Sequence, residues 1–251
     1  ALALSPGCAD AHVILAEDIA DPADRLVHYE TAVAAGLDHL DPAEHDAARG
    51  DLWSLPRARP FLRALLGLAF TLHEMGRLDE AVARYRELLD HDRADHQYAR
   101  GRLVRALLDA RRDREALDDL RRGGALLPDP DLSADLFAWT EAQACFRVAR
   151  AGDHAGDDAG ARAGAGAASG AGAATEADAD ADALLTRARR RNRYVRRLLL
   201  EPPEHDPDDD SPRPGGRRGD AQVVSLLLGG PWRQTEGAVG WLKGHRLGGK
   251  G

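Results

Sequence analysis

The sequence predicts an all-α protein: a right-handed, helical-hairpin solenoid of about three or four hairpins, with a disordered insertion and a small C-terminal helical cap. Three observations predict this architecture. One apolar pattern recurs after 35 residues. The 251 residues include 47 alanines but only 5% aromatic residues, which suits closely packed helices better than a β-sandwich. A long central segment contains no large apolar residue.

Two copies of the apolar pattern follow each other along the chain. Each position of the first copy has a counterpart 35 residues later. Within each copy the apolar positions recur at helical spacing, so each copy predicts two short antiparallel helices. The matching pairs are Leu68 and Leu103, Ala69 and Val104, Leu72 and Leu107, Ala81 and Ala116, and Tyr85 and Leu120.

A short break separates the two helices of each copy. Gly76 is placed to end the first helix in a left-handed conformation, and Arg111 takes the corresponding position in the second copy. Ala81 and Ala116 fall where the paired helices must approach closely. We therefore expect both alanines to be buried between helices.

The N-terminal part predicts one more hairpin. Residues 9–20 form the first helix, Asp21 and Pro22 supply an N-cap and a first-turn proline, and the second helix ends at Gly36. Residues 37–59, which include Trp53, are expected to be a longer connection.

Residues 1–6 look like the last turn of a preceding repeat. We therefore expect the sequence to lack an N-terminal repeat element.

The C-terminal half predicts a hairpin interrupted by an insertion. Residues 132–150 and 184–200 have helical apolar patterns, whereas residues 149–183 have no Val, Ile, Leu, Met or aromatic residue. Such a segment buries too little apolar surface to offset its ordering entropy. A turn at residues 229–231 divides two further short helices, 220–228 and 232–243.

The predicted organisation therefore has six parts. They are helical repeats at 1–148, a flexible insertion at 149–183, a final Arg-rich repeat helix at 184–200, a linker at 201–219, a helical cap at 220–243 and a flexible tail at 244–251.

This layout resembles the tetratricopeptide repeat, a helix–turn–helix unit, most closely at residues 61–92. Residues 59–64, 67–69 and 76–82 are similar to a group of uncharacterised bacterial tetratricopeptide proteins, which are similar in turn to the suppressor-of-tumorigenicity-seven family. The resemblance implies a scaffold with a concave binding groove and brings no catalytic residues. The positions that carry the repeat signature are Leu65, Leu68, Ala69, Leu72, Gly76, Ala81, Tyr85 and Leu88.

Charge and composition limit the classes of partner. A net charge of -8 argues against wholesale binding to nucleic acid or to an anionic membrane. No apolar run approaches the ~20 residues of a membrane helix, and no signal peptide is evident. The excess of Arg, Ala, Gly and Asp suggests a GC-rich bacterial genome. We expect a cytoplasmic bacterial protein.

No motif predicts catalysis, a cofactor or a metal site. His73-Glu74 begins like a metalloprotease motif, but position 77 is Arg77, so we expect both residues on an exposed helix face. Residues 91–96 hold two histidines and two aspartates that could reach one metal ion. We favour a solvated turn there, and Cys8 and Cys145 lack metal-ligand spacing.

The expected function is non-catalytic binding of a peptide or protein segment in the concave groove. By resemblance, the first helix of each unit lines this groove, and its mixture of apolar, aromatic and cationic groups suits a partner with acidic character. The partner's identity and the oligomeric state stay open. The predicted groove residues are Arg63, Leu66, Phe70, His73, Tyr98, Arg102 and Arg105.

The alternative function is binding of a polyanion or nucleic acid. Residues 187–197 contain seven arginines and Tyr194, a strip that could bind phosphate groups. The opposing interpretation is a solvated outer face balanced by acidic segments. The strip consists of Arg187, Arg189, Arg190, Arg191, Arg193, Arg196 and Arg197.

Overall fold

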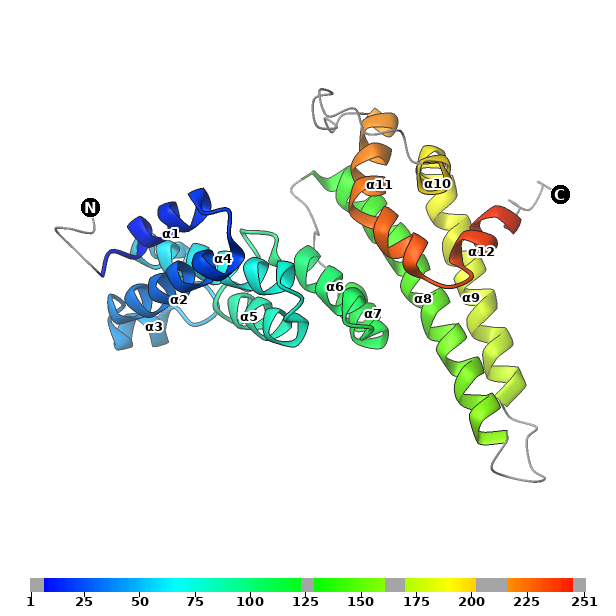
Figure 1. Cartoon of the computed structure of the whole chain (residues 1–251), viewed down its shortest axis with the longest axis horizontal. Helices are drawn as coiled ribbons and strands as arrows, with labels where there is room; N and C mark the ends of the chain where they lie inside the picture. The colour runs from blue at the N-terminus through cyan, green and yellow to red at the C-terminus, as the bar shows by residue number, and fades with distance from the viewer. Residues whose placement is uncertain (1–6, 123–128, 161–169, 202–215, 246–251) are drawn as a thin grey trace. The chain divides into compact units, whose positions relative to one another are not determined.

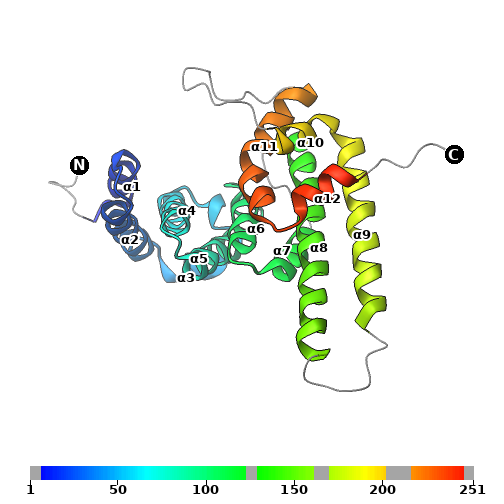
Figure 2. The ribbon, with the colours of Figure 1, turned by 45° about the vertical axis from the view of Figure 1, so that its right-hand side comes forward.

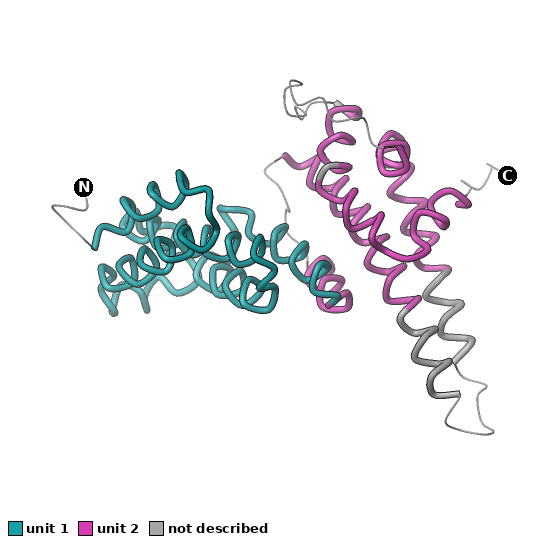
Figure 3. The backbone as a smooth tube through the Cα atoms, in the orientation of Figure 1, with its two compact units in different colours: residues 1–111 teal, residues 112–251 magenta. Residues whose placement is uncertain are grey.

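The computed structural model describes residues 7–122, 129–160, 170–201 and 216–245. Within these residues all regular elements are helical, which confirms the predicted all-α class, and an isolated bridge pairs Asp51 with Asp92. The chain forms two compact units, residues 1–111 and 112–251 (Figure 3). The boundary lies within the second predicted hairpin, where the sequence suggests no division. None of the described helices is long and apolar enough to cross a lipid bilayer.

Unit 1 begins with the hairpin of α1 (Ala9–Asp18) and α2 (Pro22–Asp38). Asp21 caps α2 as predicted, because its carboxylate accepts hydrogen bonds from the backbone N–H groups of Ala23 and Asp24. The predicted helix end at Gly36 is wrong. Gly36 is buried inside α2, where the absence of a side chain lets Phe61 pack directly on the backbone.

The connection between this hairpin and the next is more structured than predicted. It contains α3 (Pro42–Ala47) and two 3-10 turns, Leu52–Ser54 and Pro56–Ala58. Asp41 caps α3 in the same way that Asp21 caps α2, and a proline again follows the cap. The Asp-Pro pair thus marks a helix start at both places, and only the first was recognised in the sequence.

The two copies of the apolar pattern form helices where the sequence predicts them. The first copy is α4 (Arg59–Glu74) and α5 (Leu78–His91), and the second is α6 (Ala99–Asp109) in unit 1 and α7 (Asp113–Arg121) in unit 2. The corresponding turn residues both have a positive φ angle, 74° at Gly76 and 59° at Arg111. The 35-residue offset between the two copies is therefore confirmed at the turn, because Arg111 adopts the left-handed conformation that Gly76 has and that usually favours glycine.

The alanines predicted to lie between helices are fully buried. We expect Ala81→Leu to lower the free energy of unfolding by about 1–3 kcal/mol, because a larger side chain overpacks the site. Ala83 lies two residues away on an exposed part of α5 and supplies the matched control. In urea unfolding followed by circular dichroism, Ala83→Leu should change little. Equal effects of the two substitutions would contradict this packing.

In unit 2, α8 (Pro130–Gly160) and α9 (Gly170–Arg191) run side by side as the predicted hairpin (Figures 1 and 2). Both helices extend into the segment that the sequence assigns to a flexible insertion, and Ala149 and Ala181 at its ends are buried. Residues 161–169 lie outside the described residues. The predicted single helix 184–200 is wrong, because Asn192 ends α9 and caps a separate helix, α10 (Arg193–Leu200).

The C-terminal cap also differs from the prediction. The expected turn at residues 229–231 lies within α11 (Gly216–Gln234), which includes Pro231. The break falls later, at Gly237, whose φ angle of 75° precedes α12 (Ala238–Gly244). The predicted linker 201–219 is described only at Glu201 and from Gly216 onward, and the tail only as far as His245.

Stacked aromatic rings connect three helices of unit 2. Trp232 packs edge-on against Trp139 and is parallel to Trp241, with centroid distances of 5.9 Å in both cases. Trp241 also stacks on Phe146 at 4.4 Å. Residues from α8, α11 and α12 are thus joined in one apolar cluster.

Candidate functional site

The predicted groove residues lie on α4 and α6, the first helices of their hairpins in unit 1, except Tyr98, which directly precedes α6. We name the exposed face formed by α1, α4 and α6 the first-helix surface. Side-chain contacts between these helices involve Asp10 of α1, Arg63, Phe70 and His73 of α4, and Arg102, Arg105 and Asp109 of α6.

Two of these contacts link α4 to its neighbours. Arg63 forms an ion pair with Asp10 of α1. The guanidinium of Arg102 lies over the ring of Phe70, with its Cζ atom 5.2 Å from the ring centroid. At an exposed site such a contact contributes about 0.5–1 kcal/mol. Phe70 nevertheless remains 39% exposed, so an aromatic ring flanked by a cation faces solvent.

The third contact is a charged cluster around Asp109. The carboxylate accepts a hydrogen bond from Nε2 of His73 at 2.9 Å and one from Nε of Arg105 at 2.8 Å. Burial by itself would raise the pKa of Asp109, but the bond from His73 and the charge of Arg105 outweigh it and lower that pKa. The carboxylate therefore stays ionised and holds the side chains of His73 and Arg105 in place.

The remaining predicted groove residues make weaker candidates. Leu66 is half-buried on α4. Tyr98 is half-buried directly before α6 and has a φ angle of 54°, so its position is determined largely by the backbone of the turn. The structure thus places five residues of the predicted set in three separate contacts: Arg63 with Asp10, Phe70 with Arg102, and His73 and Arg105 with Asp109.

The prediction that His73 and Glu74 share an exposed face is correct only for Glu74. That side chain is exposed and forms an ion pair with Arg25 of α2 at 2.5 Å. His73 is half-buried against Asp109. The two residues therefore point to different neighbours and do not form a common site.

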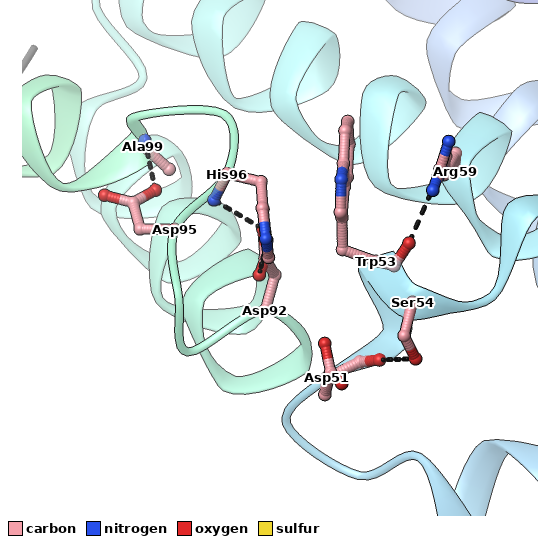
Figure 4. A network of polar contacts seen from close by, with 8 residues as sticks. All are labelled: Asp51, Trp53, Ser54, Arg59, Asp92, Asp95, His96 and Ala99. Carbon is pink, nitrogen blue, oxygen red and sulfur yellow. Dashed lines mark hydrogen bonds and ion pairs between the residues drawn. The ribbon is translucent and has the colours of Figure 1, made fainter. Parts of the chain in front are cut away.

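The prediction of a solvated turn at residues 91–96 is correct only in part, because Arg93, Ala94 and His96 are exposed whereas both aspartates are buried. Asp92 is 1% exposed and accepts hydrogen bonds from the backbone N–H of His96 at 2.9 Å and from its Nδ1 at 2.8 Å (Figure 4). The imidazole of His96 in turn stacks on Trp53, with ring centroids 5.3 Å apart.

Asp95, the second carboxylate of this turn, holds the start of α6. It accepts hydrogen bonds from the backbone N–H groups of Ala99 at 2.6 Å and Arg100 at 3.1 Å. Burial raises the pKa of Asp95 even though these bonds favour the charged form. Both carboxylates therefore already accept hydrogen bonds: Asp92 from the backbone and the imidazole of His96, and Asp95 from backbone N–H groups at the start of α6. Among the residues that the structure describes, no group of three or more His, Cys, Asp or Glu is placed to hold a metal ion.

The arginines of the strip differ in their partners. Two of its members bind acidic residues of α8: Arg187 pairs with Glu141, and Arg191 donates to Asp135 at 2.8 Å. Two others bind the end of α12. Nη1 of Arg189 donates to the carbonyl of His245 at 2.8 Å, and Nε of Arg196 donates to that of Leu242 at 3.0 Å.

The other three arginines of the strip are exposed. Arg193 donates to the hydroxyl of Tyr194 at 3.1 Å, and Arg197 lies 3.9 Å from a carboxylate oxygen of Glu201. Arg190 has no partner among the described residues. Consequently four arginines of the strip contact other helices of unit 2, although Arg187 and Arg191 are also exposed, and the other three make no such contact within the described part of the chain.

A threonine–histidine pair in unit 2 was not anticipated from the sequence. Oγ1 of Thr186 lies 3.2 Å from Nε2 of His245, at the edge of a pocket of about 510 Å³. Nη1 of Arg189, which is always protonated, lies 2.6 Å from Nδ1 of the same ring. Nδ1 must then accept that bond, so Nε2 carries the proton and cannot take one from the threonine. This pair is not arranged to activate a nucleophile.

Three residues that contact the predicted site residues were not identified from the sequence. Asp10 pairs with Arg63, Asp109 binds His73 and Arg105, and the guanidinium of Arg218 lies over the ring of Tyr194. Asp109 could have been found from its place four residues after Arg105, a spacing that pairs opposite charges on a helix. Asp10 and Arg218 contact residues far away in the sequence, so local spacing carries no signal for them. No protein-family model, curated protein or solved structure matches this chain.

Proposed function

We propose that the chain is a non-catalytic cytoplasmic scaffold protein that binds an extended segment of a partner protein along the first-helix surface. The observation that carries the proposal is the exposure of Phe70 beside Arg102. Aromatic and arginine side chains are the commonest anchors of protein interfaces. The resemblance to tetratricopeptide repeats supports a right-handed solenoid in which this surface is concave.

The charges of the surface favour a partner segment with acidic and apolar residues. Arg63 and Arg102 are both exposed, and the pairing of Arg63 with Asp10 leaves it half in solvent. An acidic residue of the partner would form a charge-assisted hydrogen bond with Arg102 while an apolar side chain covers Phe70. The cluster around Asp109 holds neighbouring side chains in one arrangement, which reduces the entropy lost on binding.

A peptide-display selection against the immobilised chain tests the proposal. Selected peptides should contain an apolar residue next to acidic residues. Changing both anchors, Phe70→Ala and Arg102→Ala, should weaken binding by roughly thirtyfold or more, which corresponds to about 2 kcal/mol. Affinity is measured by fluorescence anisotropy.

Val27→Ala is the matched control, because Val27 is 59% exposed on α2, a second helix. This substitution removes a comparable apolar contact outside the first-helix surface and should leave affinity unchanged. If it weakens binding as much as the double substitution, or if neither affects binding, the partner uses another surface and the proposal is wrong.

The arginine strip as a whole supports the alternative function less well. Four of its seven arginines are committed to Glu141, Asp135 and the carbonyl groups that end α12. Using them for a polyanion would break the arginine contacts of the buried Glu141 and Asp135 and of the carbonyl groups that end α12, at a cost of about 1–3 kcal/mol for each group left unpaired. We therefore place partner binding on unit 1.

A further inference from the structure

A cationic cluster surrounds one tyrosine where α10 meets α11. We name Arg193, Tyr194, Arg197 and Arg218 the Tyr194 cluster. The guanidinium Cζ atoms of Arg193 and Arg218 lie 5.0 Å and 5.4 Å from the centroid of the Tyr194 ring. Two like charges thus share one aromatic ring, although they repel each other. Arg218 comes from α11 and is not part of the predicted strip.

Three members of the cluster, Tyr194, Arg197 and Arg218, line a pocket of about 370 Å³. Its wall combines Tyr194, Arg197 and Arg218 with the apolar side chain of Leu198, the amide of Gln222 and the carboxylate of Glu201. Glu201 is the one acidic residue among the described lining residues, and it lies 3.9 Å from Arg197 with both side chains about four-fifths exposed. One loosely placed carboxylate does not balance three guanidinium groups.

The start of α11 adds positive potential to the same place. Arg217 and Arg218 occupy the first turn of this 19-residue helix, and that first turn contains no acidic residue; the acidic residue of the helix, Asp220, follows it and is buried. The N-terminus of a helix carries a partial positive charge, so basic residues there are unfavourable unless an anion is near. The guanidinium groups of Arg193 and Arg218 also lower the pKa of Tyr194, as expected for a phenol in a cationic environment.

We propose that the Tyr194 cluster binds the phosphate group of a phosphate monoester, with Arg197 and Arg218 as its ligands in the pocket and Arg193 adding positive charge at the Tyr194 ring. Guanidinium groups bind phosphate oxygens through paired N–H donors, and a phosphate dianion neutralises two of the three charges. Leu198 and the Tyr194 ring provide an apolar wall for the group that carries the phosphate. The pocket has the size of a small-ligand site and does not fit a duplex. This inference is independent of the function proposed for unit 1.

Calorimetric titration with phenyl phosphate at about pH 8, where the monoester is a dianion, tests the proposal. Ionic strength is held constant with potassium chloride. Wild-type protein should show saturable binding, and Arg218→Gln should weaken it at least tenfold. Arg190→Gln removes an exposed arginine of α9 outside the cluster and should bind as the wild type does. Circular dichroism verifies that both variants are folded.

A second readout follows the phenol itself. A bound dianion should raise the pKa of Tyr194 towards its ordinary value, a shift seen in absorbance at alkaline pH and absent in Tyr194→Phe. Parallel titrations with inorganic phosphate and a phosphoserine peptide identify the source: binding of the peptide alone assigns the site to phosphorylated side chains, and binding of the small anions assigns it to free phosphate compounds. The proposal is overturned if none of the three phosphate probes binds saturably, or if Arg190→Gln and Arg218→Gln weaken binding equally.

Discussion

Replacing Gly36 with alanine should destabilise unit 1 by about 2 kcal/mol or more, although alanine is the better helix former. A Cβ atom at position 36 would lie 2.8 Å from Cβ and 2.9 Å from Cα of Phe61. Carbon atoms pack best at about 3.5–4.0 Å, so α2 and the start of α4 would have to move apart. This overpacking outweighs the roughly 1 kcal/mol that alanine gains in helix propensity. Urea unfolding followed by circular dichroism measures the loss.

Gly240→Ala is the matched control. Gly240 lies within α12 and has no heavy atom within 4 Å of the position its Cβ would occupy. There the helix propensity of alanine acts alone, and we expect a gain of up to about 1 kcal/mol. A stabilising effect of Gly36→Ala would mean that Phe61 does not pack on α2 as described.

Gly36 also shows why helix ends were harder to predict than helices. Repetition of Leu, Ala and Tyr at fixed offsets was enough to locate α4, α5, α6 and α7, because those positions are buried in both copies. A glycine near the end of an apolar pattern, however, indicates either a stop or a close approach. Only the contact with Phe61, 25 residues later in the sequence, distinguishes the two.

The candidate sites show the same difference between what a local pattern predicts and what contacts between distant residues decide. The resemblance to tetratricopeptide repeats assigned Phe70 and His73 to the groove face of α4. Helical spacing placed the arginines of residues 187–197 on one helix, which the structure divides into α9 and α10. It could not show which charges would be used internally. Arg187 binds Glu141 and Arg196 binds the end of α12, contacts that depend on how distant helices pack. Which arginines of a charged segment remain available to a partner therefore depends on tertiary packing.

Asn192→Asp should be the most destabilising single-atom change in unit 2. Asn192 is fully buried, and its Nδ2 donates to Oδ2 of Asp135 at 2.7 Å and to the carbonyl of Arg217 at 2.9 Å. Aspartate would replace this donor by an oxygen that faces two acceptors. It would also bury a second negative charge beside Asp135, whose pKa burial already raises. We expect a loss on the order of 3 kcal/mol at neutral pH.

The loss should shrink as the pH falls. Two adjacent buried carboxylates favour sharing a proton, so the folded variant has a carboxyl pKa above the unfolded value of about 4. The part of the loss that comes from the second buried charge is then fully present above the folded pKa and disappears below the unfolded pKa. Unfolding free energies of variant and wild type, compared at neutral and acidic pH, measure this difference.

Asn192→Leu separates the effect of charge from the loss of hydrogen bonds. Leucine has a similar volume but cannot cap α10, whereas aspartate can still accept the hydrogen bond that the backbone N–H of Tyr194 now donates at 3.2 Å. The leucine variant should therefore be destabilised by an amount that changes much less with pH, because position 192 then carries no ionisable group. If the deficit of Asn192→Asp stays as constant with pH as that of Asn192→Leu, the side chain at position 192 does not face Asp135. The break between α9 and α10 would then rest on backbone preferences alone, and not on the buried hydrogen bonds that tie Asn192 to α8 and α11.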